Sequence, residues 1–270
     1  MEIIKAIILG IIQGITEWLP VSSTGHMILA NEFIHLLGGQ NKDFVDLFLV
    51  VIQFGSILAV VTLYFNRLNP FSPKKTAQEK KATWSMWFKV LVAEIPAAVV
   101  GLLFDDYIDE KLYNWFTVAL MLLLYGIAFI IVEKRKKEAT ILTIDDITYK
   151  TALLMGVFQM LALVPGTSRS GATILGAVIL GTSRAVAAEF SFFLAVPVMF
   201  GASLLKIAKY GFVMNGEELG LLLVGMTTAY IVSVFSIKFL VEFVKKHDFT
   251  PFGWYRIILA VVIFAYFLSR

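Results

Sequence analysis

Residues 10–26 read GIIQGITEWLPVSSTGH, and this stretch decides what kind of protein the chain is. Its first half has an apolar helical pattern, and its second half breaks that helix at a proline and starts a new one among hydroxyl side chains. The spacing i, i+3, i+4, i+7 places Gly10, Gln13, Gly14 and Glu17 on one helix face. Two glycines there let another backbone approach closely, and an ionisable residue inside an apolar segment is costly and usually functional. The stretch therefore predicts a helix that is interrupted within a membrane at a polar site.

A similar stretch, PGTSRSG at residues 165–171, lies in the second half of the chain. The two halves align at a constant offset of 146 residues. At this offset Gly10, Gln13, Gly25, Phe54 and Gly55 match Gly156, Gln159, Gly171, Phe200 and Gly201. In the same frame Ser22 matches Ser168, Ser23 matches Arg169 and Thr24 matches Ser170. Glycines and polar residues that stay in register over 46 positions indicate an internal repeat rather than a chance pairing of apolar residues.

The composition restricts the class of protein. Of the 270 residues, 59% are hydrophobic and 16% are charged, and the mean hydropathy is +0.82. A soluble domain is nearer about 45–50% apolar and about 25% charged, which argues against a two-domain soluble enzyme or a disordered chain. The net charge of +3 is too small to indicate a nucleic-acid partner. The absence of cysteine excludes disulfides, thiolate metal sites and cysteine nucleophiles. We therefore predict an integral membrane protein that contacts lipids and not nucleic acid.

Apolar runs of the right length for membrane spans indicate the architecture. A helix needs roughly 20 residues to cross about 30 Å of hydrocarbon. Six runs qualify, at 44–65, 87–104, 115–132, 189–206, 219–242 and 254–269. Two more apolar segments, 2–30 and 151–182, are interrupted by proline, glycine, serine and charge.

These segments predict an all-α polytopic integral membrane protein with a single membrane domain over residues 1–270. It consists of a first repeat over 1–145 and a second over 146–270, each made of one re-entrant helical hairpin and three transmembrane helices. Because each half has an odd number of spans, the second repeat is expected to be inverted relative to the first.

The basic residues predict the orientation. Twelve Lys and Arg, among them Lys136, lie in the loops 66–83 and 133–150 and directly after the fifth span. Five, among them Arg270, lie in the opposite connections. The richer side is expected to face the cytoplasm, so both termini are expected outside. This holds only if both interrupted segments enter and leave on the same side. The alternative is that one of them is an ordinary kinked span.

The two interrupted loops supply different chemical groups. The first loop offers a carboxylate, hydroxyls and an imidazole from Glu17, Ser23 and His26, and the second offers a guanidinium from Arg169. Each loop leads into a helix N-terminus, which favours an anion. If the loops converge, they provide a base or metal ligand, a nucleophile, a proton shuttle and a phosphate clamp, which suits phosphoryl transfer. The simpler alternatives are that the hydroxyls only cap helices and that Arg169 only balances Glu17.

The motifs QGITEWLPVSSTGH (13–26) and PGTSRSGAT (165–173) resemble the two signature motifs of the undecaprenyl-diphosphate phosphatases of the bacitracin-resistance type. The similarity covers nearly the whole chain and includes residues 51–59. The resemblance implies an enzyme of the bacterial plasma (inner) membrane whose active site faces the outer side. Such an enzyme removes one phosphate from the C55 diphosphate with a divalent metal, usually Mg²⁺ or Ca²⁺. It thereby recycles the lipid carrier for cell-wall synthesis and confers bacitracin resistance.

The resemblance also implies roles for individual residues. Glu17, Ser23, His26 and Arg169 match the family's catalytic group. Position 13 is Glu in some members and Gln in others, so a metal site made of Gln13 and Glu17 has one carboxylate instead of two, and we expect weaker metal binding. The expected phosphate-binding residues are Ser22, Thr24, Gly166, Ser168, Ser170 and Gly171, and Gln53 is the expected supporting polar group.

The sequence leaves the mechanism and one rival function open. The nucleophile is Ser23 with His26 or Glu17 as its base, or His26 itself, or water. The i, i+3 spacing favours Ser23 working with His26. The rival function is a secondary transporter or flippase that moves an anionic lipid or small anion through the same inverted-repeat site. A re-entrant-loop channel fits less well, since an ion pathway does not need His26 and Arg169. The expected partners are the polyprenyl diphosphate and, as an option, a second copy of the chain in a homodimer.

Overall fold

The computed structural model describes residues 1–39, 41–135, 137–211 and 214–269, so Lys136 and Arg270 of the charge balance lie outside the described residues. Within these ranges the regular elements are helical, apart from an isolated β-bridge between Ile141 and Thr182. The α-helices are α1 (Glu2–Thr16), α2 (Ser23–Phe33), α3 (Lys42–Leu63), α4 (Phe65–Leu68), α5 (Ala77–Leu112), α6 (Trp115–Lys134), α7 (Tyr149–Met160), α8 (Arg169–Ile179), α9 (Arg184–Tyr210), α10 (Gly216–Lys246) and α11 (Thr250–Leu268). Two 3₁₀ turns, η1 (Leu36–Gly39) and η2 (Leu161–Leu163), complete the described elements.

Six of the described helices, α3, α5, α6, α9, α10 and α11, are long and apolar enough to cross a membrane. They cover the six predicted runs, so the prediction of an all-α polytopic membrane protein is confirmed. The largest difference is α5, which has 36 residues and begins well before the predicted 87–104. Thr76 and Glu79 form a capping box that starts this helix in its charged first turn, ahead of the apolar part that hydropathy detects.

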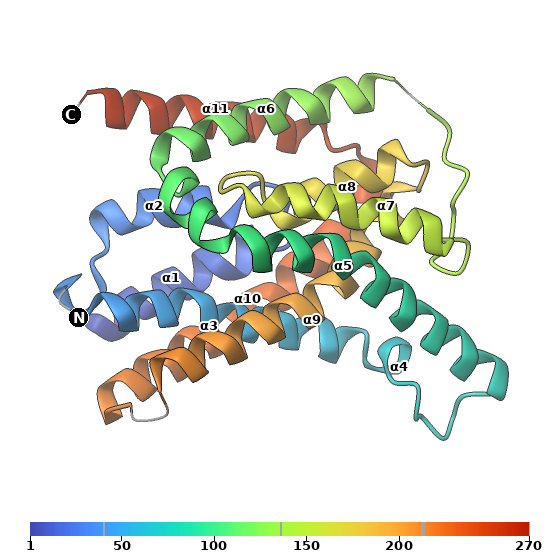
Figure 1. The fold of residues 1–270 in the computed structure, drawn as a ribbon, viewed down its shortest axis with the longest axis horizontal. Coiled ribbons are helices and arrows are strands. Elements are labelled where there is room, and N and C mark those ends of the chain that lie inside the picture. The colour runs from blue at the N-terminus through green and yellow to red at the C-terminus, as the bar shows by residue number, and fades with distance from the viewer. Residues whose placement is uncertain (40, 136, 212–213, 270) are drawn as a thin grey trace.

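The two interrupted segments form helix pairs. α1 and α2 are separated by residues 17–22, and α7 and α8 by η2 and residues 164–168. Figure 1 shows the outer ends of α1 and α2 at the left of the molecule and the outer ends of α7 and α8 at the right. Each pair therefore turns back inside the molecule, which is the course that a re-entrant hairpin follows.

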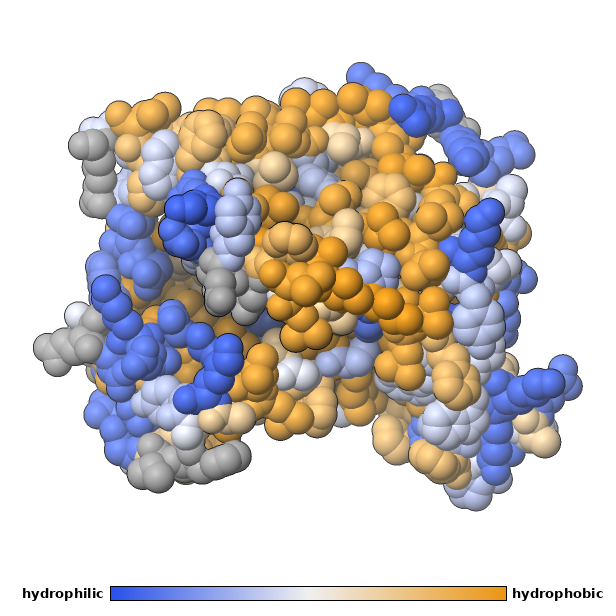
Figure 2. All heavy atoms as spheres, viewed as in Figure 1, coloured by the Kyte–Doolittle hydropathy of each residue, from blue (hydrophilic) through white to orange (hydrophobic). Residues whose placement is uncertain are grey.

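The surface shows where lipid would contact the protein. In Figure 2 a broad hydrophobic band lies between two ends at which hydrophilic residues gather. Large apolar side chains in the candidate spans are exposed, for example Leu102 at 87%, Phe235 at 68% and Phe88 at 53%. Contiguous apolar surface of this extent is stable only in lipid. The basic loops that follow α3 and α6 lie at the right-hand end of this view.

Glycines let both hairpins approach their neighbours closely. A Cβ atom added to Gly10 or Gly14 would lie 2.8 Å from a backbone carbonyl oxygen of α10. At the repeat-matched Gly156, an added Cβ would lie 2.1 Å from the carbonyl oxygen of Ala93 in α5. Each hairpin thus packs on the second span of the opposite half, as two halves related by an internal two-fold axis would do. The inversion of one repeat relative to the other stays a prediction.

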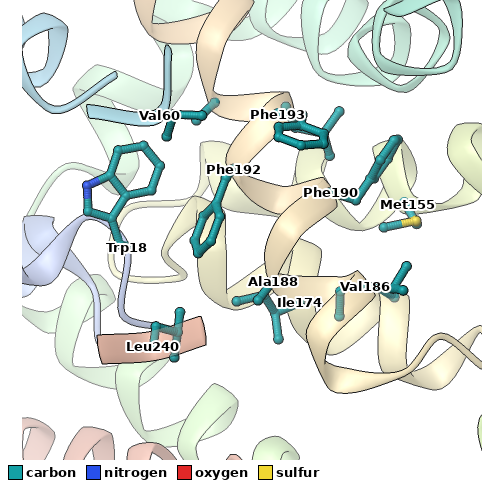
Figure 3. Packing of buried hydrophobic residues seen from close by; sticks show 14 of the residues in the cluster. Trp18, Val60, Met155, Ile174, Val186, Ala188, Phe190, Phe192, Phe193 and Leu240 are labelled. Atoms are coloured by element: carbon teal, nitrogen blue, oxygen red, sulfur yellow. The ribbon is translucent and has the colours of Figure 1, made fainter. Parts of the chain in front are cut away.

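The loop after α1 is anchored in the hydrophobic core. Trp18 is fully buried and packs edge to face on Phe192 of α9, with ring centroids 5.4 Å apart (Figure 3). Phe190 and Phe193 of α9 are fully buried in the same cluster. Because Glu17 directly precedes Trp18, this packing fixes the position of the Glu17 carboxylate.

Candidate active site

Both helix breaks end in the same type of cap. Ser22 precedes α2 and Ser168 precedes α8, and each has a φ of 72°, which residues other than glycine rarely adopt. The Ser22 hydroxyl accepts a hydrogen bond from the Gly25 amide, and the Ser168 hydroxyl accepts one from the Gly171 amide. Two of the three predicted phosphate-binding serines thus serve as helix caps. Their strained backbone is typical of functional loops.

The Glu17 carboxylate is the centre of a buried polar cluster. Glu17 and Gln13 are both buried, on the helix face that their spacing predicts. Gln13 Nε2 donates to Glu17 Oε2 over 2.9 Å, and Ser23 Oγ donates to the same oxygen over 3.3 Å. Arg169 Nη2 donates to Glu17 Oε1 over 2.9 Å. The structure therefore brings together three of the four predicted catalytic residues and Gln13.

Arg169 is held by the first hairpin and by α9. Its Nη1 donates to the Ser191 carbonyl oxygen over 2.7 Å, and its guanidinium lies 5.7 Å from the centre of the Trp18 ring. The Arg169 and Glu17 side chains are only 12% and 6% exposed, so removing either partner would leave a buried unpaired charge. Arg169 Nε is buried and has no hydrogen-bond partner within the described residues. This nitrogen is a donor that an oxyanion could use.

The second loop is hydrogen-bonded to the first through the side chain of Ser170. Ser170 Oγ lies 3.1 Å from the Glu17 carbonyl oxygen and 3.3 Å from that of Leu19. The Thr173 and Ser191 hydroxyl oxygens lie 2.6 Å apart and form a hydrogen bond. Ser191 is also the residue whose carbonyl oxygen accepts from Arg169 Nη1. The predicted Ser170 therefore contacts the opposite hairpin, while Ser191 is a supporting residue that the sequence analysis missed.

Arg256 of α11 connects the two loops and was also missed. Its side chain is fully buried. Nε donates to the Pro20 carbonyl oxygen and Nη2 to the Thr167 carbonyl oxygen, one from each loop. A charge inside the predicted span 254–269 was the available signal, because the rule that singled out Glu17 applies equally to Arg256.

Two of the predicted phosphate-binding glycines have a steric reason to be glycine. A Cβ on Gly171 would lie 2.1 Å from Arg256 Nη2. Gly166 has a φ of +92°, and a Cβ there would lie 2.5 Å from the Val118 carbonyl oxygen. Both glycines thus let the second loop pack closely against α6 and α11.

An open cavity of about 460 Å³ leads to the cluster. Gln13, Ser23 and Thr24 line it from the first hairpin, and Gln53 lines it from α3. Asp46, Tyr113 and Lys206 also line it, and Lys206 Nζ lies 3.9 Å from Asp46 Oδ2. Ser23 therefore shares this cavity with Lys206, a cation that the sequence analysis did not consider. Neither Glu17 nor Arg169 is among its lining residues.

His26 points away from this cluster. Its Nδ1 lies 2.7 Å from the Ser22 carbonyl oxygen and its Nε2 lies 2.6 Å from the Tyr255 hydroxyl. The His26 ring also stacks on the Tyr255 ring at 5.6 Å. The expected contact between Ser23 and His26 is not formed, because the imidazole turns back toward its own helix cap and α11. The catalytic role of His26 stays a prediction.

The second half contains a related polar pair. Gln159, which matches Gln13 in the repeat, donates to the Glu94 carboxylate of α5 over 2.7 Å. The matched glutamine of each hairpin thus donates to a carboxylate. Glu17 directly follows the helix that carries Gln13, whereas Glu94 lies on α5, a span that packs against the hairpin of Gln159.

The described residues do not form a metal site on their own. Among them no group of three or more His, Asp or Glu is close enough to hold a metal ion. Gln13 and Ser23 donate to one Glu17 oxygen and Arg169 to the other, so these donors compete with a hard cation for the carboxylate oxygens that would be its ligands. The pair Gln13 and Glu17, predicted to bind metal, therefore fits a metal poorly in this arrangement.

Six candidate spans, two broken helix pairs and a buried serine–carboxylate–arginine cluster at the breaks define the class. The protein is a polytopic membrane protein with a polar site between two broken helix pairs.

The chain belongs to the bacitracin resistance protein BacA family, which matches residues 6–262. It is 60% identical over 269 residues to a protein of Enterococcus faecalis named undecaprenyl-diphosphatase, covering 98% of this chain and 97% of the relative. A relative of the same name from Acetivibrio thermocellus is 57% identical and covers 100% of this chain and 99% of its own length. A third, from Streptococcus mutans, is 56% identical over 274 residues and covers 100% and 97%.

Proposed function

We propose that this protein hydrolyses undecaprenyl diphosphate to undecaprenyl phosphate and inorganic phosphate. The activity recycles the lipid carrier for cell-wall synthesis and confers resistance to bacitracin. Family membership and high identity over nearly the full length of proteins named undecaprenyl-diphosphatase support this function. They give no support to the transporter or flippase that the sequence left open.

The observation that carries the mechanism is the hydrogen bond from Ser23 to Glu17 beside Arg169. Glu17 accepts the Ser23 proton while Ser23 Oγ bonds to the terminal phosphorus and the bond to the bridging oxygen breaks. Arg169 turns its donors from Glu17 toward the phosphoryl oxygens and stabilises their charge. Water then attacks the phosphoseryl phosphorus, the bond to Ser23 Oγ breaks, inorganic phosphate leaves, and Glu17 returns the proton to Ser23.

The direction of the cavity supports an active site on the outer side. Asp46 lies near the start of α3, Lys206 near the end of α9, and Tyr113 directly after α5. These helix ends lie at the left in Figure 1, opposite the basic loops. With the basic end in the cytoplasm, the cavity opens toward the outside of the bacterial plasma membrane. A homodimer stays an expectation.

The test of the function is phosphate release from a polyprenyl diphosphate by the purified protein in detergent. We expect release that stops with EDTA and returns when excess Mg²⁺ or Ca²⁺ is added. In this proposal the diphosphate oxygens supply most of the metal ligands, because the protein alone offers too few. Release that continues in EDTA would refute the metal requirement. No release by folded protein with any divalent metal would refute the phosphatase and favour the transporter.

Lys206 is expected to bind substrate. Lys206 is a cation that lines the same cavity as Ser23. Its Nζ lies 3.9 Å from Asp46 Oδ2, which is long for an ion pair. Lys206→Met should raise KM for the diphosphate about 10-fold and change kcat little, because a charge-assisted contact is lost at a partly exposed site. Steady-state kinetics should show no change for the control Lys209→Met, three residues further along α9. Equal KM values for both variants would contradict this role.

A further inference from the structure

A second cavity, of about 540 Å³, lies at the other end of the molecule. The end of α6, the segment after it, the end of α8, the start of α9 and Val244 of α10 form its walls. Arg184 of this cavity and Lys206 of the first lie 22 residues apart on α9, which is about 33 Å along a helix. The second cavity is therefore remote from Ser23, and the proposed reaction does not use it.

The cavity carries an excess of positive charge. Arg135, Lys137 and Arg184 line it together with one carboxylate, that of Glu133. Glu133 accepts hydrogen bonds from Arg184 Nη2 over 2.6 Å and from the Phe249 amide over 3.1 Å, so its charge is already compensated. Within the described ranges, neither Arg135 nor Lys137 forms an ion pair. Two cations therefore remain available to a ligand.

A buried hydroxyl in the same wall also lacks a partner. Thr182 is 3% exposed and lines the cavity, and its Oγ1 has no hydrogen-bond partner among the described residues. A buried hydroxyl without a partner costs free energy that a ligand oxygen would recover. The wall is rigid here, because the amides of Thr140 and Ile141 both donate to the Gly181 carbonyl oxygen and the Ser183 amide donates to Ile141. The hydroxyl thus lies in a preformed position.

The remaining wall is apolar. Val132, Val178, Ile179 and Val244 also line the cavity, and Lys137 Nζ donates to the Ile179 carbonyl oxygen over 3.5 Å. The end of α6 and the residues after it, which line the cavity, lie at the end of the molecule that holds the basic loops (Figure 1). Basic pockets between transmembrane helices at the cytoplasmic boundary are suited to the phosphate groups of anionic lipids.

We propose that this cavity binds the phosphate group of an anionic phospholipid from the cytoplasmic leaflet. Arg135 and Lys137 contact the phosphate oxygens, and the Thr182 hydroxyl donates a hydrogen bond to one of them. The start of an acyl chain lies against the apolar side chains that line the cavity, Val132, Val178, Ile179 and Val244. The site is separate from the proposed hydrolysis and does not depend on it.

The test is native mass spectrometry of the purified protein with phosphatidylglycerol, with zwitterionic phosphatidylcholine, or with inorganic phosphate. We expect at least about 10-fold more phosphatidylglycerol than phosphatidylcholine adduct on the unaltered protein, a difference that Arg135→Gln with Lys137→Gln abolishes. Thr182→Val should weaken the adduct several-fold with no change in charge. The matched control, Lys80→Gln with Lys81→Gln, removes two charges at the same end but outside the cavity. Thermal unfolding in lipid-free detergent checks that every variant is folded.

Three outcomes would overturn the proposal. Equal adducts of the two lipids would show that the cavity does not recognise the anionic headgroup. An equal loss in both double variants would show diffuse attraction by the basic end. Inorganic phosphate that displaces the lipid at millimolar concentration would identify free phosphate as the ligand of the same residues, whereas lipid adducts that persist support the phospholipid.

Discussion

Replacing Arg169 with alanine is expected to lower phosphate release on the order of 10²–10⁴-fold. Arg169 is the cation beside Ser23 and Glu17, and its Nε has no other partner within the described residues. The loss should appear in kcat, because the guanidinium stabilises charge that develops on the transferred phosphoryl group. Arg169→Lys keeps the charge without the planar set of donors and should recover only part of the rate.

Loss of activity must be separated from loss of folding. Arg169→Ala leaves the Glu17 carboxylate buried and unpaired, which destabilises the protein by about 3–5 kcal/mol. Adding Glu17→Gln removes that charge, so thermal stability should recover while activity stays low. The control Lys245→Ala removes the ion pair with Glu242, in which the two side chains are 56% and 60% exposed, and should change neither property. Full activity of folded Arg169→Ala would remove Arg169 from the mechanism.

Replacing Ser23 with alanine is expected to cost at least about 10³-fold in kcat, as the loss of a nucleophile does. Ser23 lines the open cavity and donates to Glu17, whereas both ring nitrogens of His26 already face Ser22 and Tyr255. His26→Gln should therefore cost less than Ser23→Ala, although the sequence alone favoured a joint role.

Trapping the phosphorylated protein decides between the nucleophiles. After a rapid acid quench, a phosphoserine at position 23 survives, whereas a phosphohistidine at position 26 is lost in acid. We expect acid-stable phosphate on Ser23, absent from Ser23→Ala. Acid-labile phosphate, or substantial turnover by folded Ser23→Ala, would favour His26 or water.

The sequence by itself determined the class of protein and the places where its helices break. Hydropathy is a local property, so six apolar runs were enough to identify six candidate spans. Prolines and hydroxyl clusters are also local signals, and they marked both loops correctly. Glu17, Ser23 and Arg169 could be selected because charge and hydroxyls in apolar segments are conspicuous, and the repeat paired the two loops before any contact was known.

Only the tertiary structure decided which groups meet. Glu17 and Arg169 are 152 positions apart, and Arg256 binds a carbonyl oxygen 236 positions away. Such contacts depend on how closely α1 packs on α10 and α11 packs on α6. The local sequence pattern of a helix does not specify the distance to the helix it packs on. The donors to Glu17, the rotation of His26 toward Tyr255 and the presence of Lys206 in the same cavity as Ser23 follow from the same packing. Side-chain direction is set by neighbours from other helices, so it becomes fixed only when the helices pack together.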